Sequence, residues 1–305
     1  MRRRPRAGPG PVVRCDVEGL PLPLAGRAAK ITGVDPLGII AGNGEFPFCL
    51  ARAARRQGIP RLVAAAFEGE TDPAIASCVD EVVWLKIGQL DRLIKVFTSR
   101  GVRQVVMAGG ITPANLFKNL RLDWRMLGVA ARLPERNAAS IFGAVAGEMH
   151  KDGVELVDPR PFLGDAVPSA GALTRQEPSA AQREEIAFGL KIAKAVSVLD
   201  IGQTVVVKLG TVLAVEGFEG TDECIRRGGA LAGDKGGAVV VKVSKPNQDF
   251  RFDIPCIGMT TIQSCAAGQI AVLAIEAGSS LLLGRDELLT AADRQELRVV
   301  GVEAQ

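Results

Sequence analysis

Histidine is nearly absent from this chain, which has one, His150, in 305 residues. A single histidine cannot build a His-rich dinuclear metal site, and a Ser/His/Asp hydrolase would depend on His150 alone. The six cysteines include no Cys-x-x-Cys pair, so we expect no zinc site and mostly buried thiols in a reducing compartment. The G-x-S-x-G elbow and the G-x-x-x-x-G-K-[ST] phosphate loop are also missing. Asp, Glu, Lys, Arg and glycine turns remain as the carriers of chemistry.

The chain also lacks a long apolar run. No window approaches ~18 uninterrupted apolar residues, and Arg14, Asp16 and Glu18 interrupt the apolar stretch that a signal peptide needs after its basic start. Residues 1–36 carry seven Lys or Arg against three acids, so the basic excess belongs to this segment, which is either a disordered extension or a misplaced start. The nearly neutral remainder gives no reason to expect nucleic acid as a partner. The sequence predicts a cytoplasmic protein.

The first half alternates short apolar strands with amphipathic helices, as in a Rossmann-like parallel sheet. Two of its strands end in small residues. Gly42, Asn43 and Gly44 follow the strand at 37–41, and Gly109 and Gly110 follow the strand at 104–108. Such turns let a phosphate approach the backbone, but tight strand-to-helix turns explain the glycines equally well. Pro47 stands where the dinucleotide fingerprint needs its third glycine.

A helix is predicted over residues 116–133. Leu120, Trp124, Leu127 and Ala131 share one face, and arginines occupy another. The helix therefore either packs on the protein by its apolar side or rests on an anionic membrane surface.

Prolines and glycines between residues 158 and 178 interrupt the periodicity and predict a linker. The expected domains are an N-terminal α/β domain at 37–157 and a C-terminal mixed-sheet α/β domain at 179–303. The second domain should begin with a helix capped by Ser179 and Gln182, and should contain a hairpin across Leu209 and Gly210.

Polar residues concentrate between Asp200 and Pro255 in the second domain. The side chain of Asp222 suits either a helix cap or a ligand for substrate, and Thr221 is an alternative cap. Alternation predicts a strand at 249–254 with Asp249, Arg251 and Asp253 on one face. An Asp beside an Arg commonly forms only a salt bridge. Asp253 differs because it lies two residues before Pro255, where the strand must stop. Carboxylates without nitrogen ligands favour Mg²⁺, which shares its shell with phosphate oxygens. Water attack on a phosphoanhydride could use Mg²⁺ and a lysine for charge and Asp253 as proton acceptor.

Seven motifs in fixed order carry a family resemblance. They are Leu37-Gly-Ile-Ile-Ala-Gly-Asn-Gly-Glu-Phe-Pro47, Val106-Met-Ala-Gly-Gly-Ile-Thr112, Leu199-Asp-Ile-Gly-Gln-Thr204, Glu219-Gly-Thr-Asp222, Ala230-Leu-Ala-Gly233, Lys242-Val-Ser-Lys-Pro246 and Phe252-Asp-Ile-Pro255. Together they resemble the LpxI-type UDP-2,3-diacylglucosamine diphosphatases of lipid A biosynthesis over about residues 37–303. The basic start departs from that pattern.

The resemblance implies two α/β domains with the active site in the cleft between them. It implies Mg²⁺-dependent hydrolysis to UMP and 2,3-diacylglucosamine 1-phosphate (lipid X), with water attacking the glucosamine-side phosphorus. Asp253 and Asp222 are the expected catalytic residues and the candidate metal ligands. The expected substrate-binding residues are Gly42, Asn43, Gly44, Gly109, Gly110, Asp200, Gln203, Thr221, Lys242 and Lys245. The expected partners are the UDP-linked diacylglucosamine and the inner-membrane surface, with which the protein would associate peripherally. A homodimer is an open alternative to a monomer.

Two other functions fit the same residues. A nucleotide-cofactor oxidoreductase would use Gly42 and Gly44, and a non-catalytic sugar-nucleotide sensor would use the carboxylates only to bind.

Overall fold

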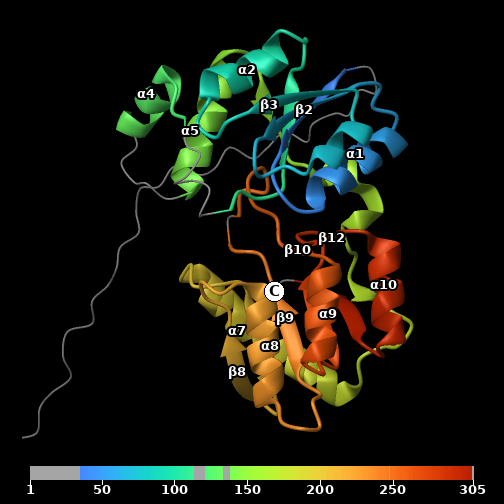
Figure 1. Cartoon of the computed structure of the whole chain (residues 1–305). Helices are drawn as coiled ribbons and strands as arrows, with labels where there is room; N and C mark the ends of the chain where they lie inside the picture. The colour runs from blue at the N-terminus through green and yellow to red at the C-terminus, as the bar shows by residue number, and fades with distance from the viewer. Residues whose placement is uncertain (1–34, 113–120, 133–137, 247, 304–305) are drawn as a thin grey trace, which may run out of the picture. The chain divides into compact units, whose positions relative to one another are not determined.

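The computed structural model describes residues 35–112, 121–132, 138–246 and 248–303, and the expected N-terminal extension lies almost wholly outside these ranges. The described residues belong to one compact unit. Within this unit lie two α/β domains with separate sheets, as expected from the sequence (Figure 1).

The first sheet has five parallel strands in the order β3-β2-β1-β4-β5. Its strands are β1 (Leu37–Ala41), β2 (Leu62–Phe67), β3 (Glu81–Leu85), β4 (Gln104–Ala108) and β5 (Glu155–Leu156). Its helices are α1 (Phe46–Arg56), η1 (Pro73–Ser77), α2 (Leu90–Thr98), α4 (Trp124–Arg132) and α5 (Ala138–Lys151). This is the Rossmann strand order 3-2-1-4-5-6 without its sixth strand, and the order reverses between β1 and β4, where such folds bind ligands.

The second sheet is mixed and has six strands in the order β6-β13-β11-β9-β7-β8. They are β6 (Gly171–Ala172), β7 (Thr204–Lys208), β8 (Thr211–Val215), β9 (Val239–Lys242), β11 (Val272–Glu276) and β13 (Arg298–Val302). Strands β9, β11 and β13 run parallel to one another. Strand β6 pairs antiparallel with β13, and β7 pairs antiparallel with β9. A separate parallel pair joins β10 (Cys256–Ile257) to β12 (Leu281–Leu282). Strands β6 and β13 are not expected from the sequence.

Helices cover both faces of the second sheet. They are α7 (Ala180–Val198), α8 (Thr221–Leu231), α9 (Met259–Ala267) and α10 (Arg285–Arg294). The short helices α6 (Arg160–Leu163) and η2 (Gly164–Ala166) precede them, and α6 packs against α1. Alternate side chains of β7 point to opposite faces of the sheet. Val205 belongs to the hydrophobic cluster with Ile186 of α7, and Val206 belongs to the cluster with Ile225 of α8. A strand buried on both faces reads as a continuous apolar run, which is how β7 and β9 appear in the sequence.

Two local predictions in this domain are confirmed. Ser179 caps α7 and forms a capping box with Gln182. Strands β7 and β8 form the expected antiparallel hairpin, whose turn contains Leu209 at φ +50° and Gly210 at φ +67°. Between the two domains, the predicted linker at 158–178 contains α6, η2 and β6.

Of the two interpretations of α4, the one in which the helix packs on the protein by its apolar side is wrong, and the membrane-surface alternative stays a prediction. Trp124 is 75% exposed and Leu127 is 52% exposed, whereas Val129 is buried in the domain core. Arg125 explains the difference, because its guanidinium faces α5 and bonds to Glu148 at 3.1 Å. The ion-paired arginine thus lies against the protein, and the face expected to be buried is exposed. Leu120 lies outside the described residues.

Candidate active site

Four strand ends of the second sheet meet at one edge. Lys242 ends β9, and its register partners are Ile275 of β11 and Thr204, the first residue of β7. Because β7 runs antiparallel to β9, its beginning lies beside the ends of its neighbours, and β8 ends at the same level. The segments after these ends carry the polar residues between 200 and 253. The mixed sheet therefore gathers at one edge residues that are far apart in sequence.

A hydrogen-bonded chain starts at Lys242, which is only 8% exposed. Its Nζ donates to Thr221 Oγ1 at 2.7 Å, and Thr221 Oγ1 donates to Glu216 Oε1 at 2.8 Å. Glu216 Oε2 accepts from the backbone N–H of Gln203 at 3.2 Å. The structure therefore brings together three predicted residues, Lys242, Thr221 and Gln203. Glu216 links them, and sequence reasoning misses its role because its partners are set by β7–β8 pairing.

A second chain connects Asp200 to Asp253. Lys245 Nζ forms an ion pair with Asp200, and the Lys245 backbone N–H donates to Gln248 Oε1 at 2.7 Å. Gln248 Nε2 then donates to Asp253 Oδ2 at 2.8 Å. Gln248 is not among the predicted residues, although its position three residues after Lys245 suits a side-chain-to-backbone bond. These contacts place Asp200, Lys245 and Asp253 in one connected network.

The approach to Asp253 is a turn, so the strand predicted over 249–254 is wrong. Asp249 Oδ1 accepts from the backbone N–H of Arg251 at 3.1 Å, and Asp249 O accepts from the N–H of Phe252 at 3.0 Å. This local bonding competes successfully with strand pairing. Asp249 and Arg251 form an ion pair at 2.6 Å, as the simpler interpretation of that pair expects. Burial raises the pKa of Asp249, but the Arg251 bonds outweigh it and leave that pKa lowered.

Asp222 does not cap α8, and neither does Thr221. Gly220 is the N-cap residue, and the helix begins at Thr221 with no side-chain cap. Asp222 lies in the first turn, where the helix dipole favours a carboxylate. Its Oδ1 is buried and makes no hydrogen bond with the part of the chain that the structure describes. The helix-cap interpretation of Asp222 is thus wrong, and this buried oxygen is one of the few polar atoms that the described residues leave unsatisfied.

The two glycine turns of the first sheet bond to each other. Gly42 N donates to Ala108 O and Asn43 N donates to Gly110 O, both at 2.8 Å. A Cβ on Gly42 would lie 2.3 Å from Gly110 O, so close packing of the turns itself requires glycine there. The N–H groups of Gly42 and Asn43 are therefore already used. Substrate binding by Gly42, Asn43, Gly44, Gly109 and Gly110 stays a prediction.

Glu70 connects these turns, and no motif in the sequence points to it. Its Oε2 accepts from Asn43 Nδ2 at 2.9 Å and from Thr112 N at 3.0 Å. Glu70 is 9% exposed, so its carboxylate is a buried anchor for both strand ends. Because glutamates often follow apolar strands, only the folded chain reveals this role.

Cysteine chemistry is disfavoured in the described residues. Cys224 and Cys265 are buried, and Cys49, Cys78 and Cys256 are half-buried; all five thiols are free. Burial raises the pKa of Cys224 and of Cys256 to about 12, so both are protonated at neutral pH. A thiol nucleophile needs a lowered pKa.

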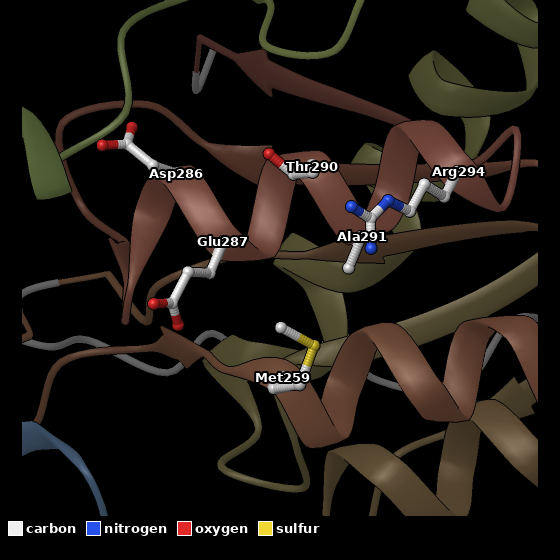
Figure 2. Close-up of a pocket in the computed structure, with 6 residues that line it drawn as sticks. All are labelled: Met259, Asp286, Glu287, Thr290, Ala291 and Arg294. Atoms are coloured by element: carbon white, nitrogen blue, oxygen red, sulfur yellow. The ribbon is translucent and has the colours of Figure 1, made fainter.

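A cavity of about 410 Å³ lies between α9 and α10 (Figure 2). Its lining residues are Met259, Asp286, Glu287, Thr290, Ala291 and Arg294. In Figure 2, Met259 of α9 faces the α10 side chains Glu287 and Ala291. None of the predicted site residues lines this cavity, so the strand edge remains the candidate site.

Among residues 35–112, 121–132, 138–246 and 248–303, no helix combines the length and apolarity needed to cross a bilayer.

Fold and site together define a two-domain α/β protein with carboxylates and lysines linked at one edge of its second sheet. Family models match nearly all of it: the LpxI N-terminal domain matches residues 36–166 and the LpxI C-terminal domain matches residues 169–300. The chain belongs to the LpxI family.

A curated relative covers both domains. The UDP-2,3-diacylglucosamine pyrophosphatase LpxI of Caulobacter vibrioides is 32% identical over an alignment of 282 residues, and the match covers 88% of this chain and 98% of that protein.

Solved structures match much more weakly. The biotin carboxylase domain of a Hydrogenobacter thermophilus 2-oxoglutarate carboxylase is 13% identical, with a TM-score of 0.25, over 64% of this chain and 41% of that chain. A phosphoribosylglycinamide synthetase from Anaerococcus prevotii is 15% identical, with a TM-score of 0.22, over 61% and 39%.

Proposed function

We propose that this protein hydrolyses the diphosphate of UDP-2,3-diacylglucosamine to UMP and 2,3-diacylglucosamine 1-phosphate, a step of lipid A biosynthesis. Membership of the LpxI family and the name of the Caulobacter relative support this substrate. The observation that carries the chemistry is the chain from the Lys245 backbone through Gln248 to Asp253, which ties the segment that carries a lysine to a carboxylate at the strand edge.

Asp253 is the proposed general base. Gln248 holds its Oδ2, and Oδ1 has no hydrogen bond from any described residue. A carboxylate fixed by one oxygen can accept a water proton with the other. In the proposed step, that water attacks the glucosamine-side phosphorus, the bond from phosphorus to the bridging oxygen breaks, and UMP leaves.

Lys242 and Lys245 are the proposed phosphate ligands. Their positive charges would stabilise the negative charge that builds on the phosphate oxygens in the transition state. Glu216, acting through Thr221, keeps the nearly buried Lys242 ammonium in place.

Mg²⁺ is the proposed cofactor. No group of three or more His, Cys, Asp or Glu able to hold a metal occurs among the described residues. Mg²⁺ commonly uses one or two carboxylates together with substrate phosphates. Asp222 fits that requirement through Oδ1, to which no described residue donates. Asp253 is the second candidate and would bind through Oδ2, because its Oδ1 is the proposed proton acceptor. When bound, the ion would neutralise phosphate charge. Chelation should abolish UMP release and added Mg²⁺ should restore it; full activity in chelator would contradict the metal requirement.

The decisive experiment supplies UDP-2,3-diacylglucosamine with Mg²⁺ in ¹⁸O-labelled water and analyses both products by mass spectrometry. Heavy oxygen is expected in the sugar phosphate and not in UMP. Label in UMP would reverse the direction of attack. Saturable binding without products would identify a sensor and overturn the proposed hydrolysis.

We also propose that the protein works at the inner-membrane surface, because the substrate carries two acyl chains. The exposed Trp124 and Leu127 of α4 support this placement, since tryptophan favours membrane–water interfaces. Vesicles of anionic lipid should retain the wild-type protein on sedimentation and retain a Trp124→Ser/Leu127→Ser variant less. Equal retention of the two proteins would contradict it.

A further inference from the structure

A buried charged cluster lies directly behind the candidate site. Glu276 ends β11, and Lys194 lies in the last two turns of α7. Their ion pair is 2.7 Å long, with side-chain exposures of 6% for Glu276 and 24% for Lys194. Ser244, 4% exposed, lies between them. None of these three residues is expected from the sequence to act in the site.

Glu276 holds the backbone where β9 leaves the sheet. Its Oε2 accepts from Ser244 N at 2.7 Å and from Ser244 Oγ at 3.0 Å. Lys194 Nζ donates to Ser244 O at 3.1 Å, so the N–H and the carbonyl of one residue are both bound by this ion pair. Ser244 directly precedes Lys245, whose backbone and ammonium belong to the Asp200–Asp253 network. The position of Lys245 is therefore set by the cluster.

The cluster also fixes the other side of that network. Helix α7 ends at Val198, and Asp200 follows in a left-handed conformation with φ +57°. Lys194 ties this helix end to Ser244, and the ion pair between Lys245 and Asp200 joins the same two segments farther out. Lys245 and Asp200 are 36% and 75% exposed as side chains. An exposed ion pair holds geometry weakly, so the buried pair is the stronger constraint on both segments.

We propose that Glu276 is a positioning residue that acts on the reaction through Ser244 and Lys245. The inference rests on the proposed function, because it assigns Lys245 to the phosphates of the substrate. A buried ion pair is weak evidence for stability by itself. The location of this one explains its presence, since it orders the segment that carries Lys245 without contacting substrate.

Steady-state kinetics of Glu276→Gln, Lys245→Ala and the double variant test the coupling. Glu276→Gln keeps the side-chain shape but leaves Lys194 unneutralised. It is expected to lower kcat/KM at least tenfold, and the double variant should be no slower than Lys245→Ala alone. The proposal would be overturned if the losses of kcat/KM from the two single substitutions multiply in the double variant, or if Glu276→Gln leaves kcat/KM unchanged. Glu177→Gln removes an exposed pair with Arg183 just before α7 and should change nothing.

Amide hydrogen exchange of residues 243–245 separates this proposal from the proposed function. Faster exchange in Glu276→Gln, with strands β7 and β11 unchanged, is expected if the carboxylate orders this segment. Unchanged exchange would overturn the positioning role whether or not the enzyme turns over. Wild-type protein that releases no UMP would refute the proposed function, and exchange would still decide the role of Glu276. If Glu276→Gln fails to fold, Lys194→Met serves in both measurements, with the same expectations.

Discussion

Asp253 is the residue on which the proposed chemistry depends most directly. Asp253→Asn keeps a hydrogen-bonding group for Gln248 but removes the proton acceptor, so kcat for UMP release should fall about 10²–10⁴-fold, the usual contribution of a general base. Circular dichroism and the thermal midpoint should stay close to wild type, because the side chain is exposed.

The matched control is Asp249→Asn, four residues earlier. It weakens the ion pair with Arg251 without touching Gln248, so kcat should change little. Near-wild-type UMP release by Asp253→Asn would remove Asp253 from the mechanism, and equal losses in the two variants would indicate damage to the loop instead.

Gly202 determines how closely two loops of the site approach. A Cβ at this position would lie 2.1 Å from Glu216 O, which is backbone and cannot move without disturbing β8. Gly202→Ala should therefore lower the free energy of unfolding by about 1–3 kcal/mol, as overpacking usually does. It should also raise KM, because Gln203 and Glu216 are forced apart. Urea denaturation and steady-state kinetics measure the two effects.

Gly143→Ala provides a control of opposite sign. Gly143 lies inside α5, and no described atom beyond its neighbouring residues and its own helix backbone comes within 4 Å of the place that an added methyl group would occupy. Alanine should stabilise this helix by about 0.5–1 kcal/mol and leave KM unchanged. A similar loss of stability in both variants would contradict the packing explanation for Gly202.

Residue types alone identify part of the site. Lys242, Thr221 and Gln203 are expected from the sequence, and they do lie in one network. Glu216, Gln248, Glu276 and Glu70 are missed, because each acts through a partner set by strand register or loop packing. Glutamates that follow apolar strands are common, and only the fold shows which of them accept backbone N–H groups.

At the level of elements, helix α7 contributes both to the stability of the second domain, through its capped start, and to the geometry of the site, through its end. Ser179 begins this helix, Lys194 joins its end to Ser244, and Asp200 follows it. Ser179→Ala removes the capping hydroxyl and should lower the free energy of unfolding by about 0.5–2 kcal/mol. Urea denaturation followed by circular dichroism measures this loss.

A capping defect is expected to fray the start of α7 and not its end. KM and kcat of Ser179→Ala should therefore match wild type at temperatures where the protein is folded. Glu184→Gln, an exposed change on the same helix, should shift stability by less than about 0.5 kcal/mol. Equal stabilities of Ser179→Ala and Glu184→Gln would contradict a contribution from the cap.

Regular elements are more predictable than irregular ones for a physical reason. Strands β1 and β4 match their expected limits, because buried apolar runs and flanking glycines define them. The turn at 249–253 has the alternation of a strand, yet the Asp249 side chain bonds the local backbone. Helix α4 has an apolar face, but the ion pairs of Arg125 decide which side lies against the protein. Long-range polar contacts of this kind leave no periodic signal.

On the scale of the whole molecule, ion-paired carboxylates in both domains set its behaviour in acid. A hydrogen bond from Lys151 lowers the pKa of Glu148, with Arg125 contributing, and one from Arg227 lowers that of Glu219. Burial raises the pKa of Asp80, but the Leu62 N–H and Arg55 outweigh it and the pKa is lowered. As the pH falls, these carboxylates therefore take up protons at a higher pH in the unfolded chain than in the folded protein.

Buried thiols determine how the free energy of unfolding changes at alkaline pH. Burial raises the pKa of Cys224 and Cys256 to about 12, above the value of about 8.5 for a thiol in an unfolded chain. These thiols stay protonated in the folded protein and ionise on unfolding, so their contribution is complete below about pH 8.5 and is lost as the pH rises toward the folded pKa.

The free energy of unfolding should accordingly be nearly constant between about pH 5 and 8 and should fall on both sides. On the acid side the carboxylate contribution is present above the unfolded pKa of about 4 and disappears as the pH falls through the lower folded values. Urea denaturation in a buffer series from pH 3 to 10, with reductant present, measures both limbs. Cys256→Ala removes one of the shifted thiols and should flatten the alkaline limb without altering the acid one. An alkaline limb of unchanged slope in that variant, or stability that rises below pH 4, would show that other groups control the pH dependence.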